Sequence, residues 1–203
     1  MEIIHGQSTE TEQKKRLIVG ISGASGVIMG YRLLEALRAY PDYEIHLVIT
    51  EGAKRNFALE TDLSLGEVEA LGDYVYDDKD FAAAIASGSF LTEGMIVLPC
   101  SMKSLSAIAN GYSATLLVRA ADCCLKEGRP VVLVTREMPL NRIQVKNMLA
   151  AMEAGCAIVP PMLTFYHGAS SLEEQIDHVV GKVLMQFGLS FSRFRPWNGP
   201  PKA

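Results

Sequence analysis

The amino-acid sequence predicts a single α/β domain, built as a doubly wound, mainly parallel sheet of the Rossmann-like or flavodoxin-like kind. A chain of 203 residues with 49% hydrophobic and 21% charged residues suits one globular domain. Apolar, β-branched runs alternate with helical stretches, which is typical of a parallel sheet covered on both faces. We expect the domain to span residues 16–189, between a polar leader (1–15) and a tail containing Pro and Gly (190–203).

Strand and helix signals alternate from the start of this domain. Residues 16–22 (RLIVGIS) predict a strand, and leucines at helical spacing predict a helix over 27–38. A second strand at 44–50 and a second helix at 52–60 repeat the pattern. The first half of the domain therefore reads as two strand–helix units.

The second half continues this alternation. A buried strand is expected at 94–100, with helices beginning near Lys103 and Thr115, and a further strand at 130–135. Three further elements follow: a helix, a short strand and a closing helix. Gly155 can end the first helix in the left-handed region, and the closing helix begins with the spacing of a capping box. These elements cover residues 140–154, 157–160 and 171–187, with Ser171 and Glu174 as the box.

Composition narrows the class of protein. A net charge of −4 gives no overall basic field, so no nucleic-acid partner is expected. The four cysteines lie in apolar runs without a C-x-x-C pair or zinc-like His spacing, which indicates reduced thiols and no metal site. The first fifteen residues lack the apolar core of an export signal, and no run is long enough to span a membrane. We therefore expect a cytoplasmic protein with no membrane partner.

The loop after the first strand is the first candidate site, because ligands of open α/β sheets bind beyond the carboxyl ends of the strands. Its sequence, Gly20-Ile-Ser-Gly23-Ala-Ser25-Gly26, lets backbone amides approach a phosphate or a flavin edge, although it also suits a plain tight turn. Its G-x-x-G-x-x-G spacing is neither the dinucleotide fingerprint nor a P-loop. The second strand ends in Thr50 instead of an acid that would bind a ribose.

Hydroxyls and charges follow the next two buried strands. Ser101, Lys103 and Ser104 stand where a helix begins, which suits an anion, polar flavin atoms or a simple N-cap. No G-x-S-x-G elbow surrounds Ser101, which argues against a hydrolase nucleophile. Arg136 and Glu137 follow the strand at 130–135. The guanidinium can bind a phosphate with two hydrogen bonds, and the carboxylate can be its charge partner or carry a proton.

Other polar positions have two interpretations each. Arg119, Asp122 and Lys126 share one helix face, which alone indicates a solvated, salt-bridged stripe. Tyr166 can donate to an anion or serve as a packing anchor. The acidic run at 77–80 reads as a solvated loop, and it lacks the D-D-x-x-D spacing that holds a diphosphate through metal ions.

Six sequence segments occur together in a fixed order. Each is a weak family signal alone, but their joint occurrence is specific: GISGASGVIMGYRLLE, ITEGAKRNFALETD, IASGSF, LPCSMKSLSAIANG, LLVRAADCCLKEGRPVVLVTREMPL and FYH. With these segments, the chain resembles the UbiX-type flavin prenyltransferases over residues 15–189. That family was formerly described as phenylacrylic or phenolic acid decarboxylases, and the chain is nearest to the subgroup associated with aromatic-acid decarboxylation. The resemblance implies metal-independent transfer of a dimethylallyl group from dimethylallyl monophosphate to N5 and C6 of reduced FMN. The prenylated FMN would then serve a separate UbiD-type decarboxylase.

The resemblance also implies site residues. FMN contacts would fall on Gly23, Ala24, Ser25, Thr50, Ser101, Met102, Lys103, Ser104 and Arg136. The prenyl phosphate would be bound by Tyr166, Lys182, Lys126, Arg136 and Glu137, and the catalytic positions would be Ser25, Glu60, Arg119, Lys126 and Glu137. Lys182 replaces the Arg of other members, so a bidentate contact becomes a point charge. Lys103 stands where other members carry a small residue.

The implied chemistry explains these residue types. Breaking the allylic C–O bond develops negative charge on the phosphate, which fixed cations and donors such as Arg136 and Tyr166 stabilise. Our hypothesis is that Glu137 and the released phosphate share the proton transfers, while Ser25 orients the flavin N5 edge. The resemblance further implies a homo-oligomer, often a dodecamer, with flavin at subunit contacts. Two alternatives stay open: an FMN-dependent decarboxylase acting directly on a small or aromatic carboxylic acid, and a non-catalytic flavin carrier.

Overall fold

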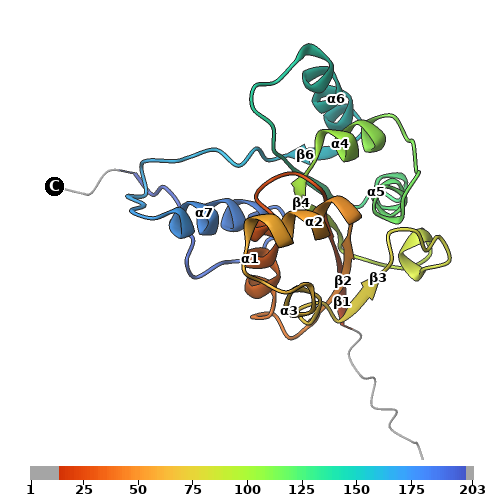
Figure 1. Cartoon of the computed structure of the whole chain (residues 1–203), viewed down its shortest axis with the longest axis horizontal. Coiled ribbons are helices and arrows are strands. Elements are labelled where there is room, and N and C mark those ends of the chain that lie inside the picture. Colours follow the sequence, from red (N-terminus) through yellow and green to blue (C-terminus); the bar gives the residue numbers. More distant parts are fainter. Residues whose placement is uncertain (1–13, 200–203) are drawn as a thin grey trace, which may run out of the picture.

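Six parallel strands form a sheet with the order β3-β2-β1-β4-β5-β6 in the computed structural model, which describes residues 14–199 (Figure 1). All five strand pairings are parallel. The predicted doubly wound α/β fold is therefore confirmed. The strands are β1 (Lys15–Ile21), β2 (Tyr43–Ile49), β3 (Tyr74–Tyr76), β4 (Gly94–Cys100), β5 (Val131–Thr135) and β6 (Cys156–Ile158).

Helices cover both faces of this sheet and divide the core into two clusters. The first cluster joins α1, α2, α3 and α7 to one face, and the second joins α4, α5 and α6 to the other. Because both faces are covered, β4 and β5 are buried along their whole length, and β1 is buried from Leu17 to Ile21. The helices are α1 (Ile28–Leu37), α2 (Glu51–Glu60), α3 (Leu65–Glu69), α4 (Met102–Ala109), α5 (Leu116–Lys126), α6 (Arg142–Glu153) and α7 (Leu172–Met185), with a 3₁₀ turn at Ala84–Ala86.

The strand order reverses between β1 and β4, and this is the position where open α/β sheets bind ligands. Ser22, the first residue after β1, joins the two strands here. Its hydroxyl donates to the Pro99 carbonyl over 3.0 Å and accepts from the Ser101 amide over 2.7 Å. Ser22 is fully buried, so these bonds fix the spacing of the two loops at the carboxyl edge.

Two elements between residues 61 and 76 were not predicted. Helix α3 begins with a complete capping box formed by Ser64 and Glu67, and β3 is a three-residue edge strand paired with β2. By contrast, the capping box predicted at the start of α7 is only half right. The Ser171 hydroxyl accepts from the Glu174 amide, but the Glu174 carboxylate accepts from the amide of Ser170, one residue before the expected partner.

The acidic run at 77–80 is a loop, but it is not wholly solvated as predicted. Asp78 is half-buried, and it caps α5 because its carboxylate accepts from the Leu117 amide over 2.9 Å. Burial raises the pKa of Asp78, while the bond from Leu117 and the charge of Lys103 act in the opposite direction. Asp78 is therefore a structural part of the carboxyl edge.

The segment after α7 folds back over that helix. Phe194 fills the space beside Gly181, where a Cβ would lie 2.3 Å from the Phe194 ring. The Tyr40 hydroxyl donates to the Ser190 carbonyl. The predicted leader, residues 1–15, lies outside the described residues except for Lys14 and Lys15, and Lys15 already belongs to β1. No helix among residues 14–199 is long and apolar enough to cross a membrane.

Candidate functional site

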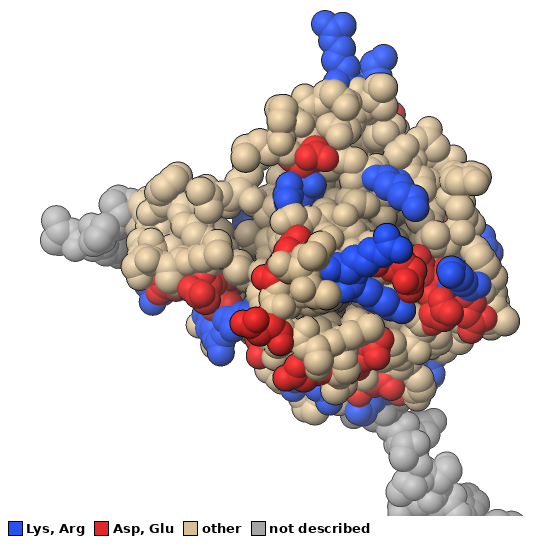
Figure 2. Space-filling model, in the orientation of Figure 1, with Lys and Arg blue, Asp and Glu red and all other residues tan. Residues whose placement is uncertain are grey.

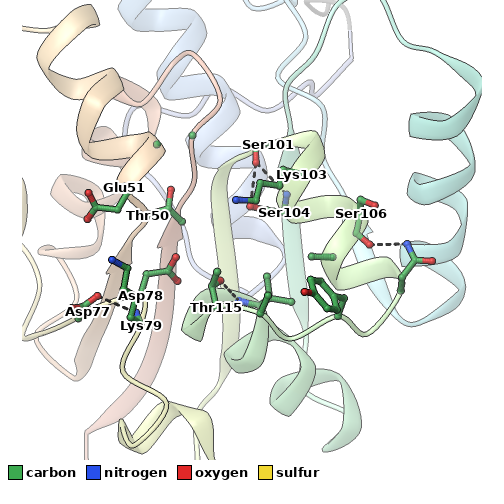
Figure 3. Close-up of a pocket in the computed structure, with 17 residues that line it drawn as sticks. Thr50, Glu51, Asp77, Asp78, Lys79, Ser101, Lys103, Ser104, Ser106 and Thr115 are labelled. Atoms are coloured by element: carbon green, nitrogen blue, oxygen red, sulfur yellow. Dashed lines mark hydrogen bonds between the residues drawn. The ribbon is translucent and has the colours of Figure 1, made fainter.

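A cavity of about 850 Å³ lies at the carboxyl edge of the sheet, between the loops that follow β1, β2 and β4 (Figure 3). Thr50 and Glu51 at the start of α2 lie on one side, and Ser101, Lys103 and Ser104 at the start of α4 lie on the other. Asp77, Asp78 and Lys79 extend the lining below them. The remaining lining residues are Gly23, Gly52, Ser106, Ala107, Asn110, Tyr112, Ala114, Thr115 and Val118.

Two helices direct their N-termini toward this cavity. The Thr50 hydroxyl accepts from the Ala53 amide over 3.3 Å, and the Ser101 hydroxyl accepts from the Ser104 amide over 3.2 Å. The N-cap interpretation of Ser101 is thus confirmed. The first amides of a helix have no intrahelical partners and carry partial positive charge, so this arrangement also favours an anion or electronegative ligand atoms.

Glycine is required where the loop after β1 passes α2. A Cβ at Gly23 would lie 2.9 Å from the Gly52 Cα, closer than real Cβ contacts allow. Gly26 has a φ of +95°, a conformation that residues with a Cβ rarely adopt. The loop therefore lies against α2 and presents its backbone at the cavity rim.

Side chains from two other elements hold this loop. The Glu60 carboxylate accepts from the Gly26 amide over 2.7 Å and from the Val27 amide over 3.4 Å, which caps α1 in place of a side chain on Val27. The Arg136 Nε donates to the Ser25 carbonyl over 3.1 Å. Three predicted site residues therefore meet although they come from different elements: Ser25 follows β1, Glu60 ends α2 and Arg136 follows β5.

Charges of both signs surround this edge. Figure 2 shows Lys and Arg side chains near the middle of the face drawn, close to α2 and α4, with Asp and Glu side chains directly beside them. Lys103 and Lys79 line the cavity together with Asp77 and Asp78. The local field is therefore mixed, and an anion would be bound by particular donors instead of by an overall basic surface.

A second group of predicted residues lies on α7 and on the loop before it. The Tyr166 hydroxyl lies 3.2 Å from the Nε2 of His178. Lys182 follows His178 by one helical turn, and its side chain is exposed. None of the lining residues of the large cavity belongs to this group.

The predicted cations of α5 lie apart from both groups. Arg119 donates to the Ala86 carbonyl over 3.0 Å and pairs with Asp122 over 2.8 Å, as the salt-bridged stripe predicts. Lys126 departs from that stripe, because it pairs with Glu127 over 2.5 Å instead of with Asp122. Neither cation is among the lining residues of the cavity in one copy of the chain.

The remaining predicted residues differ in accessibility. Ala24 is a buried residue of the loop after β1, and Met102 packs against the core on the α4 side. Glu137 is exposed, and within the part of the chain that the structure describes its carboxylate accepts only a local bond, from the Met138 amide over 3.1 Å. Burial raises the pKa of the Cys100 thiol, so this cysteine stays protonated beside Ser101.

Comparison with known proteins assigns the family. The chain matches the Flavoprotein family over residues 5–188. It is 58% identical to a probable UbiX-like flavin prenyltransferase of Sedimentibacter hydroxybenzoicus over 91% of this chain and 97% of the relative. It is 51% identical to the flavin prenyltransferase UbiX of Escherichia coli K12 over 91% of this chain and 99% of the relative. The chain belongs to the UbiX flavin prenyltransferase family.

Solved structures of UbiX proteins share this fold throughout. A dodecameric FMN-dependent UbiX-like decarboxylase from E. coli O157:H7 superimposes with a TM-score of 0.89 at 50% identity, covering 91% of this chain and 100% of that chain. AnUbiX, in complex with FMN and dimethylallyl pyrophosphate, has a TM-score of 0.89 at 45% identity, covering 92% of this chain and 98% of that chain. The UbiX resemblance noted in the sequence is thereby confirmed.

The single chain brings together part of the predicted UbiX site. The cavity residues gather at the switch point, which is where the strand order reverses between β1 and β4. Ser25, Glu60 and Arg136 form a clamp on the loop after β1, at the rim of this cavity. Sequence reasoning missed Ser22, Asp78 and His178. Each acts through a partner far away in the sequence or in a neighbouring loop, and no local motif signals such a contact.

Proposed function

We propose that this chain joins the dimethylallyl group of dimethylallyl monophosphate to N5 and C6 of reduced FMN. The observation that carries this proposal is the clamp on the loop after β1, where Glu60 binds the Gly26 amide and Arg136 binds the Ser25 carbonyl. The clamp fixes Ser25 at the switch point of the sheet, next to the cavity between α2 and α4. A site built in this way can orient a planar cofactor edge against a second substrate.

The residues at the carboxyl edge fit FMN. The contact between Gly23 and Gly52 leaves no side chain between the loop and α2, and two capped helix N-termini offer amides to phosphate or ring oxygens. Thr50, Ser101, Lys103 and Ser104 would bind the cofactor, with Gly23, Ala24, Ser25, Met102 and Arg136 completing its contacts. Reduced FMN, when bound, supplies the two nucleophilic positions that are prenylated. Ser25 would hold the N5 edge in place.

Cations and donors would bind the prenyl phosphate and stabilise the charge that grows on it as the C–O bond breaks. Arg136 is anchored by Ser25 and can present its remaining guanidinium N–H groups to this phosphate. Tyr166, Lys182 and Lys126 would supply the other contacts, and this set can neutralise a monoester without a metal ion. Glu137 is exposed and free to reach a ligand, so it would exchange protons with the released phosphate.

Parts of this site would come from neighbouring copies of the chain. Arg119, Lys126, Tyr166 and Lys182 do not line the cavity of their own copy. A run of exposed apolar side chains between residues 138 and 165 lies between Glu137 and Tyr166, and a surface of this kind favours burial against another subunit. These side chains are Met138, Leu140, Ile143, Val145, Leu149, Met152, Met162, Leu163 and Phe165. We propose a homo-oligomer, with a dodecamer as its form.

The product would be used elsewhere. Prenylated FMN has no further role in the reaction proposed for this chain, so we propose that it passes to a UbiD-type decarboxylase of aromatic acids. We place both proteins in the cytoplasm, where reduced thiols such as the four free, buried cysteines of this chain are the rule.

The mass of the extracted flavin tests the reaction. Protein, reduced FMN and dimethylallyl monophosphate are mixed without oxygen, and the flavin is analysed by mass spectrometry. We expect the mass of FMN plus one five-carbon unit. Unmodified FMN that stays tightly bound would instead favour a flavin carrier. Release of CO₂ from an aromatic acid by this protein alone would favour a direct decarboxylase.

A further inference from the structure

Tyr166 contacts two stacked histidines that the predicted site does not include, of which His178 is buried and His167 is partly buried. His178 on α7 is 4% exposed, and its Nε2 lies 3.2 Å from the Tyr166 hydroxyl. His167 stacks on His178, with ring centroids 4.3 Å apart and planes inclined by 15°. Trp197 contacts the Tyr166 ring edge-on at 5.8 Å. The Tyr166 ring is therefore packed edge-on against three other rings while 49% of the residue stays exposed.

The loop that carries Tyr166 is fastened to the same helix. The Gln175 side chain accepts from the Thr164 amide over 3.0 Å and donates to the Thr164 carbonyl over 2.7 Å. The Thr164 hydroxyl lies 2.9 Å from the Nδ1 of His167. These bonds fix the loop relative to α7. They therefore also fix the distance between the Tyr166 hydroxyl and His178.

His178 is neutral in this setting. Burial lowers its pKa, and His167 and Lys182 act in the same direction. The adjacent Asp177 carboxylate is occupied by Arg32 over 2.8 Å, with Arg193 at 3.8 Å. A neutral imidazole carries one N–H, so only one of the two ring nitrogens can donate.

The surroundings of the ring decide which nitrogen carries this proton. The Nδ1 of His178 is buried and has no hydrogen-bond partner among the described residues. A buried N–H without an acceptor is rarer in proteins than an acceptor without a donor. The proton is therefore favoured on Nε2, which donates to the Tyr166 oxygen. The single hydroxyl proton of Tyr166 then stays available for another acceptor.

We propose that His178 is a positioning residue of the prenyl-phosphate site: it donates from Nε2 to the Tyr166 phenol oxygen and so directs the Tyr166 hydroxyl proton to a phosphate oxygen. This inference rests on the proposed function. Lys182 lies one turn further along α7, so the same helix presents a cation and orients the phenol. A lysine fixes the orientation of a phosphate less than an arginine does, which makes the directed phenol more important here.

Three variants of His178 test this role, because their side chains differ in whether they can donate a hydrogen bond to the Tyr166 oxygen. In His178→Phe the ring volume stays but the donor is lost, and we expect kcat/KM for dimethylallyl monophosphate to fall about tenfold, the size of one hydrogen bond. In His178→Gln an amide can take the place of Nε2, so we expect a value within about threefold of wild type. His178→Asn carries its amide near the Nδ1 position, too short to reach Tyr166, and should resemble His178→Phe. FMN affinity should be unchanged in all three.

A double-mutant cycle with Tyr166→Phe separates positioning from general packing. If His178 acts through the hydroxyl, His178→Phe causes no further loss in the Tyr166→Phe background. Additive losses, or a wild-type kcat/KM in His178→Phe, would overturn the inference. If His178→Phe does not bind FMN, the Gln and Asn variants carry the same comparison, and equal values for these two would overturn it. Absence of prenylation by the wild-type protein would refute the proposed function instead.

Discussion

Arg136 donates from Nε to the backbone carbonyl of Ser25 over 3.1 Å, and this bond joins two loops that are 111 residues apart in the sequence. The loops follow β1 and β5, which are not neighbours, because β4 lies between them. The contact therefore spans the point where the strand order reverses. The terminal guanidinium nitrogens of Arg136 have no partner among residues 14–199, so they can bind a ligand.

Substituting Arg136 tests both tasks of this side chain. Arg136→Ala should lower kcat/KM for flavin prenylation by about tenfold to a hundredfold, because it removes a charge-assisted contact and releases the Ser25 loop. Initial rates measured by mass spectrometry of the flavin provide the comparison. Arg38→Ala is the control, since Arg38 pairs with Asp73 at the opposite end of α1 and should leave the rate unchanged. Equal rates for both variants would remove Arg136 from the site.

Gly23 is expected to tolerate no side chain. In Gly23→Ala the Cβ would lie 2.9 Å from the Gly52 Cα, so the loop or α2 must move. We expect a loss of about 1–3 kcal/mol in the free energy of unfolding, together with weaker FMN binding. Urea unfolding and a fluorescence titration with FMN measure these effects. Gly66→Ala on α3 meets no atom within 4 Å and should be neutral or stabilising, so similar losses in both variants would contradict this explanation.

Complementation between variants tests whether copies share a site. Lys126→Ala and Arg136→Ala should each keep about a tenth of the wild-type activity or less. If the two residues of one site come from different copies, random co-assembly of both variants restores about a quarter of the wild-type sites. If both residues come from one copy, co-assembly restores none. Co-expression with two different affinity tags yields the mixed oligomers, and separately purified variants mixed without exchange of subunits serve as the control.

Glu137→Gln should separate binding from chemistry. The amide keeps the size and polarity of the exposed Glu137 side chain but cannot exchange protons at neutral pH. We expect unchanged FMN affinity and a prenylation rate reduced by about a hundredfold or more. Single-turnover kinetics with pre-bound FMN measure the rate directly. Glu69→Gln on α3 is the matched control, and a Glu137→Gln rate equal to that of the control would exclude the acid/base role.

The half-buried carboxyl of Asp78 predicts a pH-dependent stability difference. Burial raises the pKa of Asp78, so the folded state binds this proton more tightly than the unfolded chain does. The resulting stabilisation is complete below the unfolded pKa and is lost as the pH rises through the folded pKa. Relative to Asp78→Asn, which cannot titrate, the wild type should therefore lose stability as the pH rises from the ordinary aspartate pKa of about 3.9 towards neutral. Urea unfolding across this range measures the difference, and parallel profiles would contradict the prediction.

Sequence patterns predicted those elements whose signal lies within their own residues. The apolar runs of β1 and β4 predicted their strands, and glycines and hydroxyls after these strands predicted the carboxyl-edge site. Strand β3 carries no such signal, because three residues are too few for a pattern. It is formed by pairing with β2, helped by the Asp73 carboxylate, which accepts from the Ile45 amide over 2.8 Å.

The parts of the site that escaped prediction depend on distant contacts. Ser22 looks like an ordinary turn residue, and its role appears only when Pro99 and Ser101 lie next to it. His178 looks like one more residue on an amphipathic helix until Tyr166 folds against it. The chemical type of the residues therefore predicted which of them gather at the strand ends. The side chains that support them, such as Ser22 and His178, could be identified only from the three-dimensional fold.

The contact between Phe194 and Gly181 links the end of the chain to the chemistry of α7. Any residue larger than glycine at position 181 would displace the Phe194 ring, and Trp197 would leave the edge of Tyr166 with it. One hydrogen atom in place of a methyl group thus decides whether residues 194–197 can close over the phenol. Residue 181 therefore controls the surroundings of a tyrosine that it does not itself touch.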